Sequence, residues 1–416
     1  MSRWQWREGN RVRLLENGEQ FFPRVFECIA AAREEVIIET FILFEDAVGR
    51  ELQGLITAAA RRGVRVELTV DGYGSESLSQ DFIRDLQAAG VELHMFEPAR
   101  RLFGSRVNIL RRLHRKIVVI DRRLAFVGGI NYSVDHLLDQ GQKSKQDYAV
   151  EVEGPVVADI HLLAGSLPRS GRPPPRHGWW RHWRRSGAAP ALPAAAGEAR
   201  VLLASRDNQL HRDDIERLYR IALRSARQRV VIANAYFFPG YRLIRELRKA
   251  ARRGVQVQLI LQGNPDMPWV SLLTRALYRH LARAGVEIHE YCARPIHAKV
   301  AVIDAEWATV GSSNLDPLSL ALNLEANLFI HDREFTAGLH SNLQELIQKH
   351  CRRVNPEQLR HPPLGALLLS YLAYHCTRYF PALIRSLPSM APVREALTRP
   401  QAALADSEKA LPQEER

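Results

Sequence analysis

Two short segments of the chain carry the same three reactive side chains at the same spacing. Each segment has a histidine, a lysine two residues later and an aspartate five residues beyond the lysine. An imidazole can attack phosphorus or move a proton, and an ammonium can hold an anionic oxygen. We therefore expect these residues to act on a phosphodiester. The candidate catalytic residues are His114, Lys116 and Asp121 in the first segment and His297, Lys299 and Asp304 in the second.

The apolar residues after each lysine predict that both segments are β-strands. The segments read LHRKIVVID and IHAKVAVID. Side chains alternate between the two faces of a strand, so each histidine projects to the same face as its lysine. If the two segments meet symmetrically, two imidazoles and two ammoniums line one cationic pocket. One such match recurs by chance, whereas two matches inside an internal repeat are a specific signal.

The two aspartates have two possible roles. Each stands an odd number of residues after its lysine, near the predicted end of the strand. Its carboxylate can therefore brace the following turn or contact the substrate. We group Asp121 and Asp304 with the catalytic residues and keep the bracing role as the alternative.

Small residues and an asparagine follow each segment, in the stretches GGIN and GSSN. Small residues allow a close approach of the backbone, and an amide side chain can donate to a phosphoryl oxygen. An acidic residue follows in each half, and its carboxylate can accept the Nδ1 proton of a histidine, leaving Nε2 to attack phosphorus. The predicted substrate-binding residues are Gly129, Asn131, Ser312 and Asn314, and the predicted histidine-orienting residues are Asp147 and Glu325.

The chain repeats itself around these segments. The stretch AAARRGVRVELTVDG in the first half resembles KAARRGVQVQLILQG in the second, and AGVELH resembles AGVEIH. The reactive segments align at a constant offset of 183 residues, from His114 and His297 onward. Such self-similarity predicts two copies of one structural unit.

Each half has the pattern of an α/β unit. The apolar runs EVIIETFIL and RVVIANAYFF predict strands that are buried on both faces. The helical stretches GRELQGLITAAARRG and YRLIRELRKAARRG end at Gly63 and Gly254, which are expected C-caps. We therefore predict an α/β fold of two pseudo-symmetric sandwich domains that share one active site at their interface.

Composition sets the predicted domain boundaries. The two α/β domains are assigned to 1–165 and 201–355. The segment between them, 166–200, is rich in Pro, Arg and Trp, which is typical of a loop. Its tryptophans interleave with arginines and suit a headgroup layer of anionic lipids, so it is either a plain linker or an interfacial anchor, or both.

The remaining segment, 356–416, is a predicted extension. Leu364 to Leu387 is apolar and aromatic, but His375, Arg378 and Pro381 interrupt it. We predict a helix lying in the membrane interface, with a buried helix that closes the domain as the alternative. The polar end of the chain is expected to fray.

Charge and cysteine content narrow the class of protein further. The 58 Lys and Arg residues against 46 Asp and Glu give a net charge of +12, which favours an anionic partner. There is no apolar run long enough for a spanning helix, and the first residues do not read as a signal peptide or an anchor. The four cysteines have no metal-ligand spacing and are expected to be free thiols of a reducing compartment.

The repeated motif resembles that of the phospholipase D superfamily, in which histidine, lysine and aspartate occur twice, each set followed by an asparagine. The resemblance covers roughly 10–355 and is greatest to the shorter bacterial cardiolipin synthases without N-terminal membrane helices. It is carried by HRKIVVIDRRLAFVGGIN and GSSNLDPLSLALNLEAN.

The resemblance implies a mechanism and a setting. One histidine, assigned here to His114, would attack phosphorus to form a phosphatidyl-histidine, while His297 would act as acid and base. The lysines and asparagines would stabilise the phosphoryl oxygens, and no metal or cofactor is expected. Expected partners are anionic phospholipids (phosphatidylglycerol and cardiolipin) and a membrane surface, with no obligate nucleic acid. The expected location is the cytoplasmic face of the bacterial inner membrane, as a peripheral protein.

Three other functions remain open at this point. The same pocket and positive charge suit a nuclease or another phosphodiesterase acting on nucleic acid. A hydrolytic phospholipase D differs only in letting water reach the intermediate. A degenerate lipid-binding scaffold is the non-enzymatic alternative, although both motifs are intact. The lipid donor, the acceptor and the oligomeric state are not determined by the sequence.

Overall fold

A computed structural model describes residues 4–98, 101–102, 105–106, 111–167, 192–208, 210–263, 277–316, 319–320, 322–355, 357 and 394–396 of the chain. The linker tryptophans and the apolar stretch from Leu364 to Leu387 lie outside the described residues, and so does Cys376.

The first half of the chain builds one α/β unit. Its elements, in chain order, are β1 (Arg7–Glu16), α1 (Asn17–Ala31), β2 (Glu35–Thr40), α2 (Ala47–Arg61), β3 (Arg65–Asp71), α3 (Gln80–Ala88), β4 (Glu92–Phe96), β5 (Arg101–Leu102), β6 (Ser105–Arg106), β7 (Ile117–Ile120), β8 (Leu124–Gly128), the 3-10 turns η1 (Val134–His136) and η2 (Leu138–Lys143), β9 (Tyr148–Glu153) and α4 (Val156–Ala164).

The second half repeats this order. Its elements are β10 (Ala199–Arg206), α6 (Asp214–Ser225), β11 (Arg229–Asn234), α7 (Tyr241–Arg252), β12 (Gln256–Gln262), β13 (Glu287–Tyr291), β14 (Lys299–Ile303), β15 (Trp307–Gly311), β16 (Glu325–His331), α10 (Arg333–His350), β17 (Cys351–Arg353) and β18 (Arg394–Ala396).

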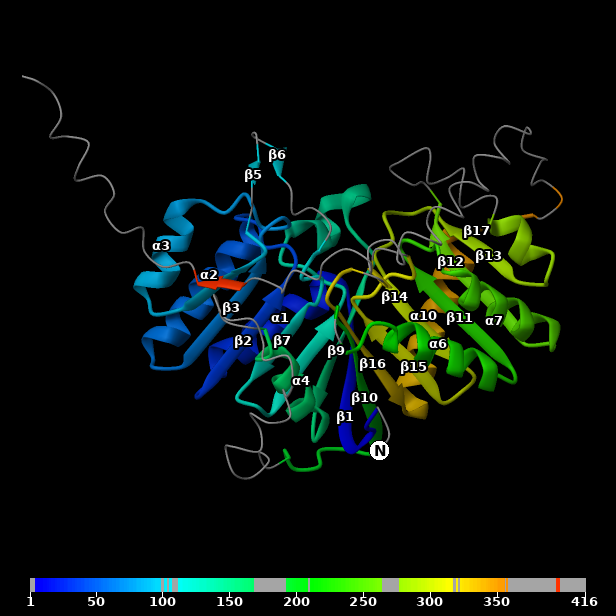
Figure 1. Cartoon of the computed structure of the whole chain (residues 1–416), viewed down its shortest axis with the longest axis horizontal. Coiled ribbons are helices and arrows are strands. Elements are labelled where there is room, and N and C mark those ends of the chain that lie inside the picture. The colour runs from blue at the N-terminus through cyan, green and yellow to red at the C-terminus, as the bar shows by residue number, and fades with distance from the viewer. Residues whose placement is uncertain are drawn as a thin grey trace, which may run out of the picture.

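Sixteen of these strands form one continuous sheet within the described residues (Figure 1). The strand order is β17, β13, β12, β11, β14, β15, β16, β10, β1, β9, β8, β7, β2, β3, β4, β18. This order is symmetric about its centre, because β1 and β10, β9 and β16, and β7 and β14 occupy equivalent places on either side. The predicted α/β fold with pseudo-twofold symmetry is confirmed.

The two halves join through the antiparallel pair β1 and β10, where Arg7 lies opposite Val201 and Asn10 opposite Ala199. In each half, three neighbouring strands run parallel: β2, β3 and β4 in the first, and β11, β12 and β13 in the second. The strand of the reactive segment is antiparallel to its neighbour among them, as β7 is to β2 and β14 is to β11. The sheet is therefore mixed, and the amino end of β7 lies beside the carboxyl end of β2. The domain boundaries given above stay a prediction.

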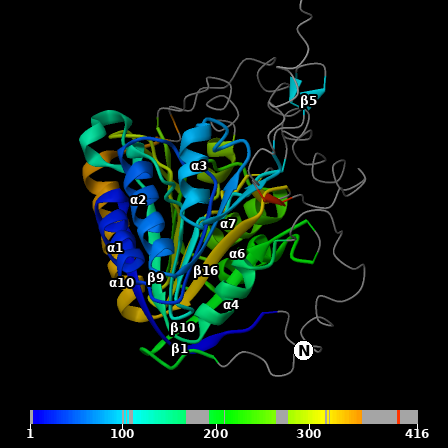
Figure 2. The same ribbon diagram turned by 90° about the vertical axis from the view of Figure 1, so that its left-hand side faces the viewer.

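Helices cover both faces of the sheet (Figure 2). Helices α1, α2 and α10 lie on one face, and α4, α6 and α7 on the other. The apolar faces of these helices pack on strands that are buried on both sides, as the continuous apolar runs predict. One buried cluster combines residues of both halves, including Val150 and Ile160 with Val300 and Leu339.

The predicted helix ends are confirmed by their backbone conformation. Gly63 and Gly254 follow α2 and α7 with φ of 91° and 90°. This left-handed conformation suits glycine because it has no Cβ, so the chain can turn directly into β3 or β12. Within the described residues, no helix is long and apolar enough to cross a membrane. Cys28, Cys292 and Cys351 are free thiols.

Candidate active site

The reactive segments meet at the centre of the molecule, but they are not strands over their whole length. β7 begins at Ile117, so His114 and Lys116 precede it, and β14 begins at Lys299. The residues before each strand pair with the opposite half. The His114 backbone N–H donates to the Leu324 carbonyl at 3.0 Å, and that of His297 donates to the Gln146 carbonyl at 2.8 Å. Contacts between the halves thus hold both histidines.

Each histidine is paired with the carboxylate of the other half. The Nδ1 of His114 lies 3.0 Å from Oε2 of Glu325, and the Nδ1 of His297 lies 2.5 Å from Oδ2 of Asp147. Both carboxylates are fully buried. A carboxylate on Nδ1 fixes the proton there and leaves Nε2 as the nitrogen available for chemistry. Each of these two pairs therefore takes its histidine from one half and its carboxylate from the other.

Burial controls the protonation of these histidines. It lowers the pKa of His114, although Glu325 opposes the shift. The pKa of His297 is held well below the ordinary value, first by burial and then by the charge of Lys299. Both imidazoles are therefore favoured in the neutral form, which is the form that can attack phosphorus or accept a proton.

The two lysines are buried beside the histidines. The Lys116 ammonium donates to the His114 carbonyl at 2.8 Å, and Lys299 donates to the His297 carbonyl. Burial lowers the pKa of Lys116 to about 7 and that of Lys299 to about 8. Phe41 forms an apolar wall, with its ring centroid 5.1 Å from the His114 ring and 5.2 Å from Lys116 Nζ. A bound phosphate anion would raise both lysine pKa values and so favour the charged ammoniums.

The two asparagines differ in how they are held. The Oδ1 of Asn131 accepts from the Ile42 backbone N–H at 3.1 Å, and its Nδ2 has no hydrogen-bond partner among the described residues. The Oδ1 of Asn314 likewise has no hydrogen-bond partner among the residues that the structure describes. Both side chains are buried. Unused amide groups at such places can bind a substrate oxygen or hydroxyl.

Gly129 and Ser312, which are predicted to bind substrate, lie against the orienting carboxylates. The Ser312 hydroxyl donates to Oε2 of Glu325 at 2.5 Å. At the equivalent place, a Cβ on Gly129 would collide with the carboxylate of Asp147. Close packing against the carboxylates therefore favours a small residue at both positions, and their contact with substrate stays a prediction.

Asp121 and Asp304 brace turns through backbone hydrogen bonds, which is the role kept above as the alternative to catalysis. Oδ1 of Asp121 accepts backbone N–H bonds from Glu34 at 2.8 Å and Glu35 at 2.9 Å. Oδ1 of Asp304 accepts equivalent bonds from the backbone N–H groups of Gln228 at 2.8 Å and Arg229 at 3.0 Å. Both aspartates have a positive φ, of 49° and 54°. Since they follow their strands and the histidines precede them, each carboxylate lies at the far end of the strand.

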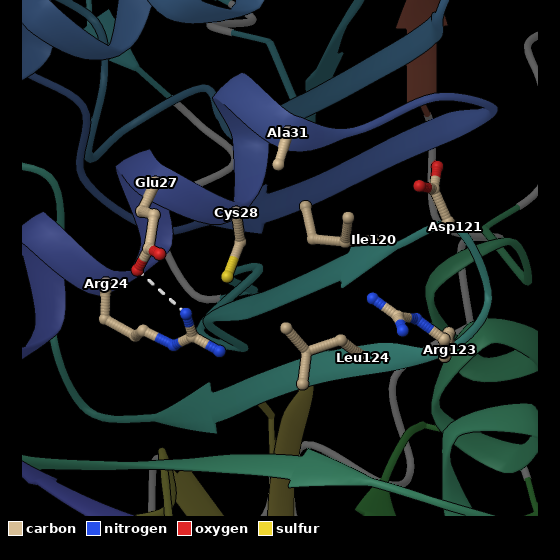
Figure 3. Close-up of a pocket in the computed structure, with 8 residues that line it drawn as sticks. All are labelled: Arg24, Glu27, Cys28, Ala31, Ile120, Asp121, Arg123 and Leu124. Carbon is tan, nitrogen blue, oxygen red and sulfur yellow. Dashed lines mark hydrogen bonds and ion pairs between the residues drawn. The ribbon is translucent and has the colours of Figure 1, made fainter.

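A small pocket lies at this far end (Figure 3). It is formed by α1, β7 and β8, and Asp121 is among its lining residues together with Cys28, Ile120 and Arg123. Burial raises the pKa of the Cys28 thiol to about 11, so this sulfur stays protonated and unreactive at neutral pH. The pocket is separate from the histidines and adds nothing to their chemistry.

A third histidine lies in the site without having been predicted. His136 is fully buried, and its ring centroid is 5.7 Å from that of His297. Its Nε2 accepts from the Asn131 backbone N–H at 3.2 Å. The internal repeat hides this residue, because the equivalent position in the second half is Ser319. In the sequence, only its position five residues after Asn131 indicated that His136 could lie near the active site.

Two groups of side chains bring possible metal ligands together among the described residues. His136, Asp147 and His297 have ligand atoms within 4.8 Å of one another. However, Asp147 Oδ2 and His297 Nδ1 already share a hydrogen bond, so this arrangement suits a hydrogen-bonded pair. In the second group, Glu67 and Glu92 are ion-paired with Arg65.

Two symmetric histidine–carboxylate pairs at the centre of an α/β sheet fit the phospholipase D class, to which the repeated motif is similar. A family model described as "Cardiolipin synthase, PLD-like domain" matches residues 25–161 and 219–347. The chain belongs to this family.

Curated relatives agree with the family model. The chain is 55% identical to cardiolipin synthase B of Salmonella typhi over 388 residues, which are 93% of this chain and 92% of the relative. It is 53% identical to cardiolipin synthase B of Escherichia coli (strain K12), with the same shares covered. Cardiolipin synthase of Geobacillus kaustophilus (strain HTA426) is 30% identical over 85% of this chain and 69% of the relative.

Solved structures support the fold. The phosphatidylserine synthase of Haemophilus influenzae Rd KW20 superposes with a TM-score of 0.65 at 14% identity, covering 90% of this chain and 94% of that one. The polyphosphate kinase of Porphyromonas gingivalis gives a TM-score of 0.56, also at 14% identity, over 89% of this chain and 53% of that one. At this level of identity the likeness concerns the fold alone.

Proposed function

We propose that this chain is a cardiolipin synthase that transfers a phosphatidyl group from one phospholipid to a hydroxyl of phosphatidylglycerol or of glycerol. The observation that carries the proposal is the pair of histidines, each bonded through Nδ1 to a carboxylate of the opposite half. Similarity to cardiolipin synthase B over 93% of the chain supports the choice of a lipid substrate.

The proposed reaction has two steps with opposite proton transfers. The anionic phosphate of the bound donor lipid favours the charged form of His297, which carries a second proton on Nε2. Nε2 of His114 attacks the phosphorus of the donor lipid, the bond to the headgroup oxygen breaks, and His297 gives its Nε2 proton to the departing alcohol. His297 then takes a proton from the acceptor hydroxyl, whose oxygen attacks phosphorus and breaks the phosphorus–nitrogen bond. Glu325 supports the charge that develops on His114, and Asp147 does the same for His297.

Buried cations stabilise the phosphoryl oxygens in this proposal. Lys116 and Lys299 lie beside the histidines, and both are fully buried or nearly so. Donors held in place before the reaction act more strongly in a site from which water is excluded. The unused Nδ2 of Asn131 adds a neutral donor.

The enzyme would act at the surface of a membrane as a peripheral protein on the cytoplasmic face. Two observations support this setting. The curated relatives are named as synthases of cardiolipin, which is a membrane lipid. The net charge of +12 suits an anionic surface. Phosphatidylglycerol and cardiolipin, which are both anionic, are the proposed lipid partners.

A product assay tests the proposal. Purified protein is given labelled phosphatidylglycerol in mixed micelles with a chelator, and the native chain is compared with His114→Ala and Glu325→Gln. We expect cardiolipin and released glycerol from the native chain, and a loss of at least about a thousandfold for His114→Ala. His340→Ala replaces a partly exposed histidine on α10 that is not part of the repeated motif; it is the matched control and should keep native activity.

The products separate this function from its alternatives. Phosphatidic acid as sole product would make the protein a hydrolytic phospholipase D. Cleavage of single-stranded DNA with no lipid turnover would replace the lipid reaction by a nuclease.

A further inference from the structure

The two halves differ beside otherwise equivalent histidine–carboxylate pairs. Glu325 accepts from His114 Nδ1 and also from the Ser312 hydroxyl. Asp147 accepts from His297 Nδ1 at Oδ2 and from the Tyr148 backbone N–H at Oδ1, at 2.9 Å. The position equivalent to Ser312 is Gly129, which has no side chain to donate. The second side-chain donor is therefore missing from the Asp147 pair.

His136 occupies the space beside this pair. One nitrogen of His136 and one of His297 lie within 4.8 Å of each other and of a carboxylate oxygen of Asp147. The two imidazole rings are close to perpendicular, at 74°. In the part of the chain that the structure describes, no third group of this kind joins the pair of Glu325 and His114, and the position equivalent to His136 is Ser319.

The hydrogen bonds of His136 define its tautomer. Its Nε2 accepts from the Asn131 backbone N–H at 3.2 Å, so in the neutral ring the proton must be on Nδ1. The Nδ1 is buried and has no hydrogen-bond partner among the described residues. A buried N–H without a partner is costly unless it serves a neighbouring charge.

We propose that His136 is a positioning residue that acts through Asp147 on His297. Its ring lies close to the Asp147 carboxylate, and its Nδ1–H, which makes no hydrogen bond to a described residue, would act on that carboxylate through space as a neutral dipole. The inference rests on the proposed phosphatidyl transfer and assigns a role in it that the repeated motif does not contain.

A neutral donor has a specific effect on proton transfer. Burial keeps the pKa of His136 well below its ordinary value even though Asp147 opposes the shift, so the ring adds no full charge. The donor stabilises the carboxylate, which then attracts the His297 proton less strongly. His297 can therefore release its proton to the departing alcohol more easily. The charged and titratable groups around these three side chains are Lys116, Lys145 with its partner Asp135, Lys299, His114 and Glu325.

Two substitutions distinguish the roles of the two nitrogens of His136. His136→Gln keeps an acceptor near Nε2 for the Asn131 amide but removes the donor beside Asp147. His136→Asn keeps a donor near Nδ1 but removes the acceptor for Asn131. The pH dependence of kcat/KM for cardiolipin formation is measured for both variants and the native chain, with thermal unfolding measured alongside.

The expected pattern is opposite to that of a purely structural histidine. His136→Gln should lower kcat/KM by about tenfold and move the limb of the pH profile controlled by His297 to higher pH by about 0.5 to 1 unit. His136→Asn should keep a near-native profile and lose mainly thermal stability. A native profile for Gln together with a shifted profile for Asn would overturn the proposal, because His136 would then only support the Asn131 turn.

A measurement on the native chain covers the case in which a variant fails to fold. The ¹⁵N signals of His136, assigned by their loss in His136→Gln or by selective labelling, should report a neutral ring with the proton on Nδ1 from about pH 5 to 9. A proton on Nε2, or a charged ring in this range, would overturn the proposal. If the native chain made no lipid product, that result would contradict the proposed function. The tautomer of His136 could still be determined, because the ¹⁵N measurement does not depend on activity.

Discussion

At the scale of single residues, the site depends on groups that burial makes sensitive to pH. Lys116 and Lys299 are both buried, with pKa values of about 7 and about 8. Two buried ammoniums near one phosphate provide strong stabilisation of the transition state only while both remain protonated. The free enzyme should therefore change its charge close to neutral pH.

The alkaline side of the pH profile tests this. In the native enzyme we expect kcat/KM to fall as pH rises through about 7 to 8, because the lysines lose their protons there. Lys116→Gln should lower kcat/KM about a hundredfold at pH 6.5. The gap between native and variant should narrow as pH rises. A constant ratio from pH 6 to 9 would mean that Lys116 does not titrate in this range.

At the scale of elements, the turns after β7 and β14 have the same construction. Asp121 accepts from the backbone N–H groups that precede and begin β2, and Asp304 does so for β11. Each carboxylate thereby joins two neighbouring strands at the end opposite the histidines. We therefore expect the aspartate of the repeated motif to support the alignment of the strands that carry the chemistry.

Asp121→Asn should affect stability far more than chemistry. We expect a loss of about 1 to 2 kcal/mol in the free energy of unfolding at pH 7, with near-native kcat for the folded protein. The backbone donors around Asp121 lower its pKa despite burial. Its contribution is therefore present above the unfolded value of about 4 and is lost as pH falls below it. Denaturant unfolding at pH 7 and pH 3 should give a difference between native and variant that shrinks in acid.

Asp85→Asn, on the exposed side of α3, is the control for the loss of a carboxylate and should change neither quantity. A large fall in kcat of folded Asp121→Asn would return Asp121 to the catalytic residues. Asp304→Asn should behave as Asp121→Asn does, since its contacts are the same.

At the scale of the whole molecule, the halves form one structure. β1 pairs with β9 of its own half and with β10 of the other, and α10 packs against β1. Buried polar contacts also cross the junction, as the Asn342 amide donates to Glu16 at 2.6 Å. The shared core and the crossed histidine–carboxylate pairs make the active site a property of both halves together.

Cutting the chain between the halves tests this unity. A protease site inserted between 168 and 191 and then cleaved should leave two fragments that co-elute on gel filtration and retain most of the cardiolipin-forming activity. The reason is that the sheet and the shared core, rather than the connecting segment, join the halves. An uncleaved chain with the same insertion is the control. Fragments that separate in buffer would show that the connection itself is required.

The sequence alone determined the elements and the reactive residues. The strands after Lys116 and Lys299, the helix ends at Gly63 and Gly254, and the symmetry of the two halves follow from local patterns of apolar residues, glycines and repeats. Local patterns suffice here because strand alternation and helix capping involve residues that are close along the chain.

Only the tertiary structure decided which groups work together. Glu325 is 211 residues from His114, and Asp147 is 150 residues from His297, so spacing along the chain could not assign either carboxylate to its histidine. The same holds for His136, which lacks a counterpart in the repeat. The sequence offered bracing as one role for Asp121, but only the fold identified its donors, which lie just before and at the start of a different strand. These roles depend on which surfaces of the two halves pack together, and that packing is fixed by contacts far apart in the sequence.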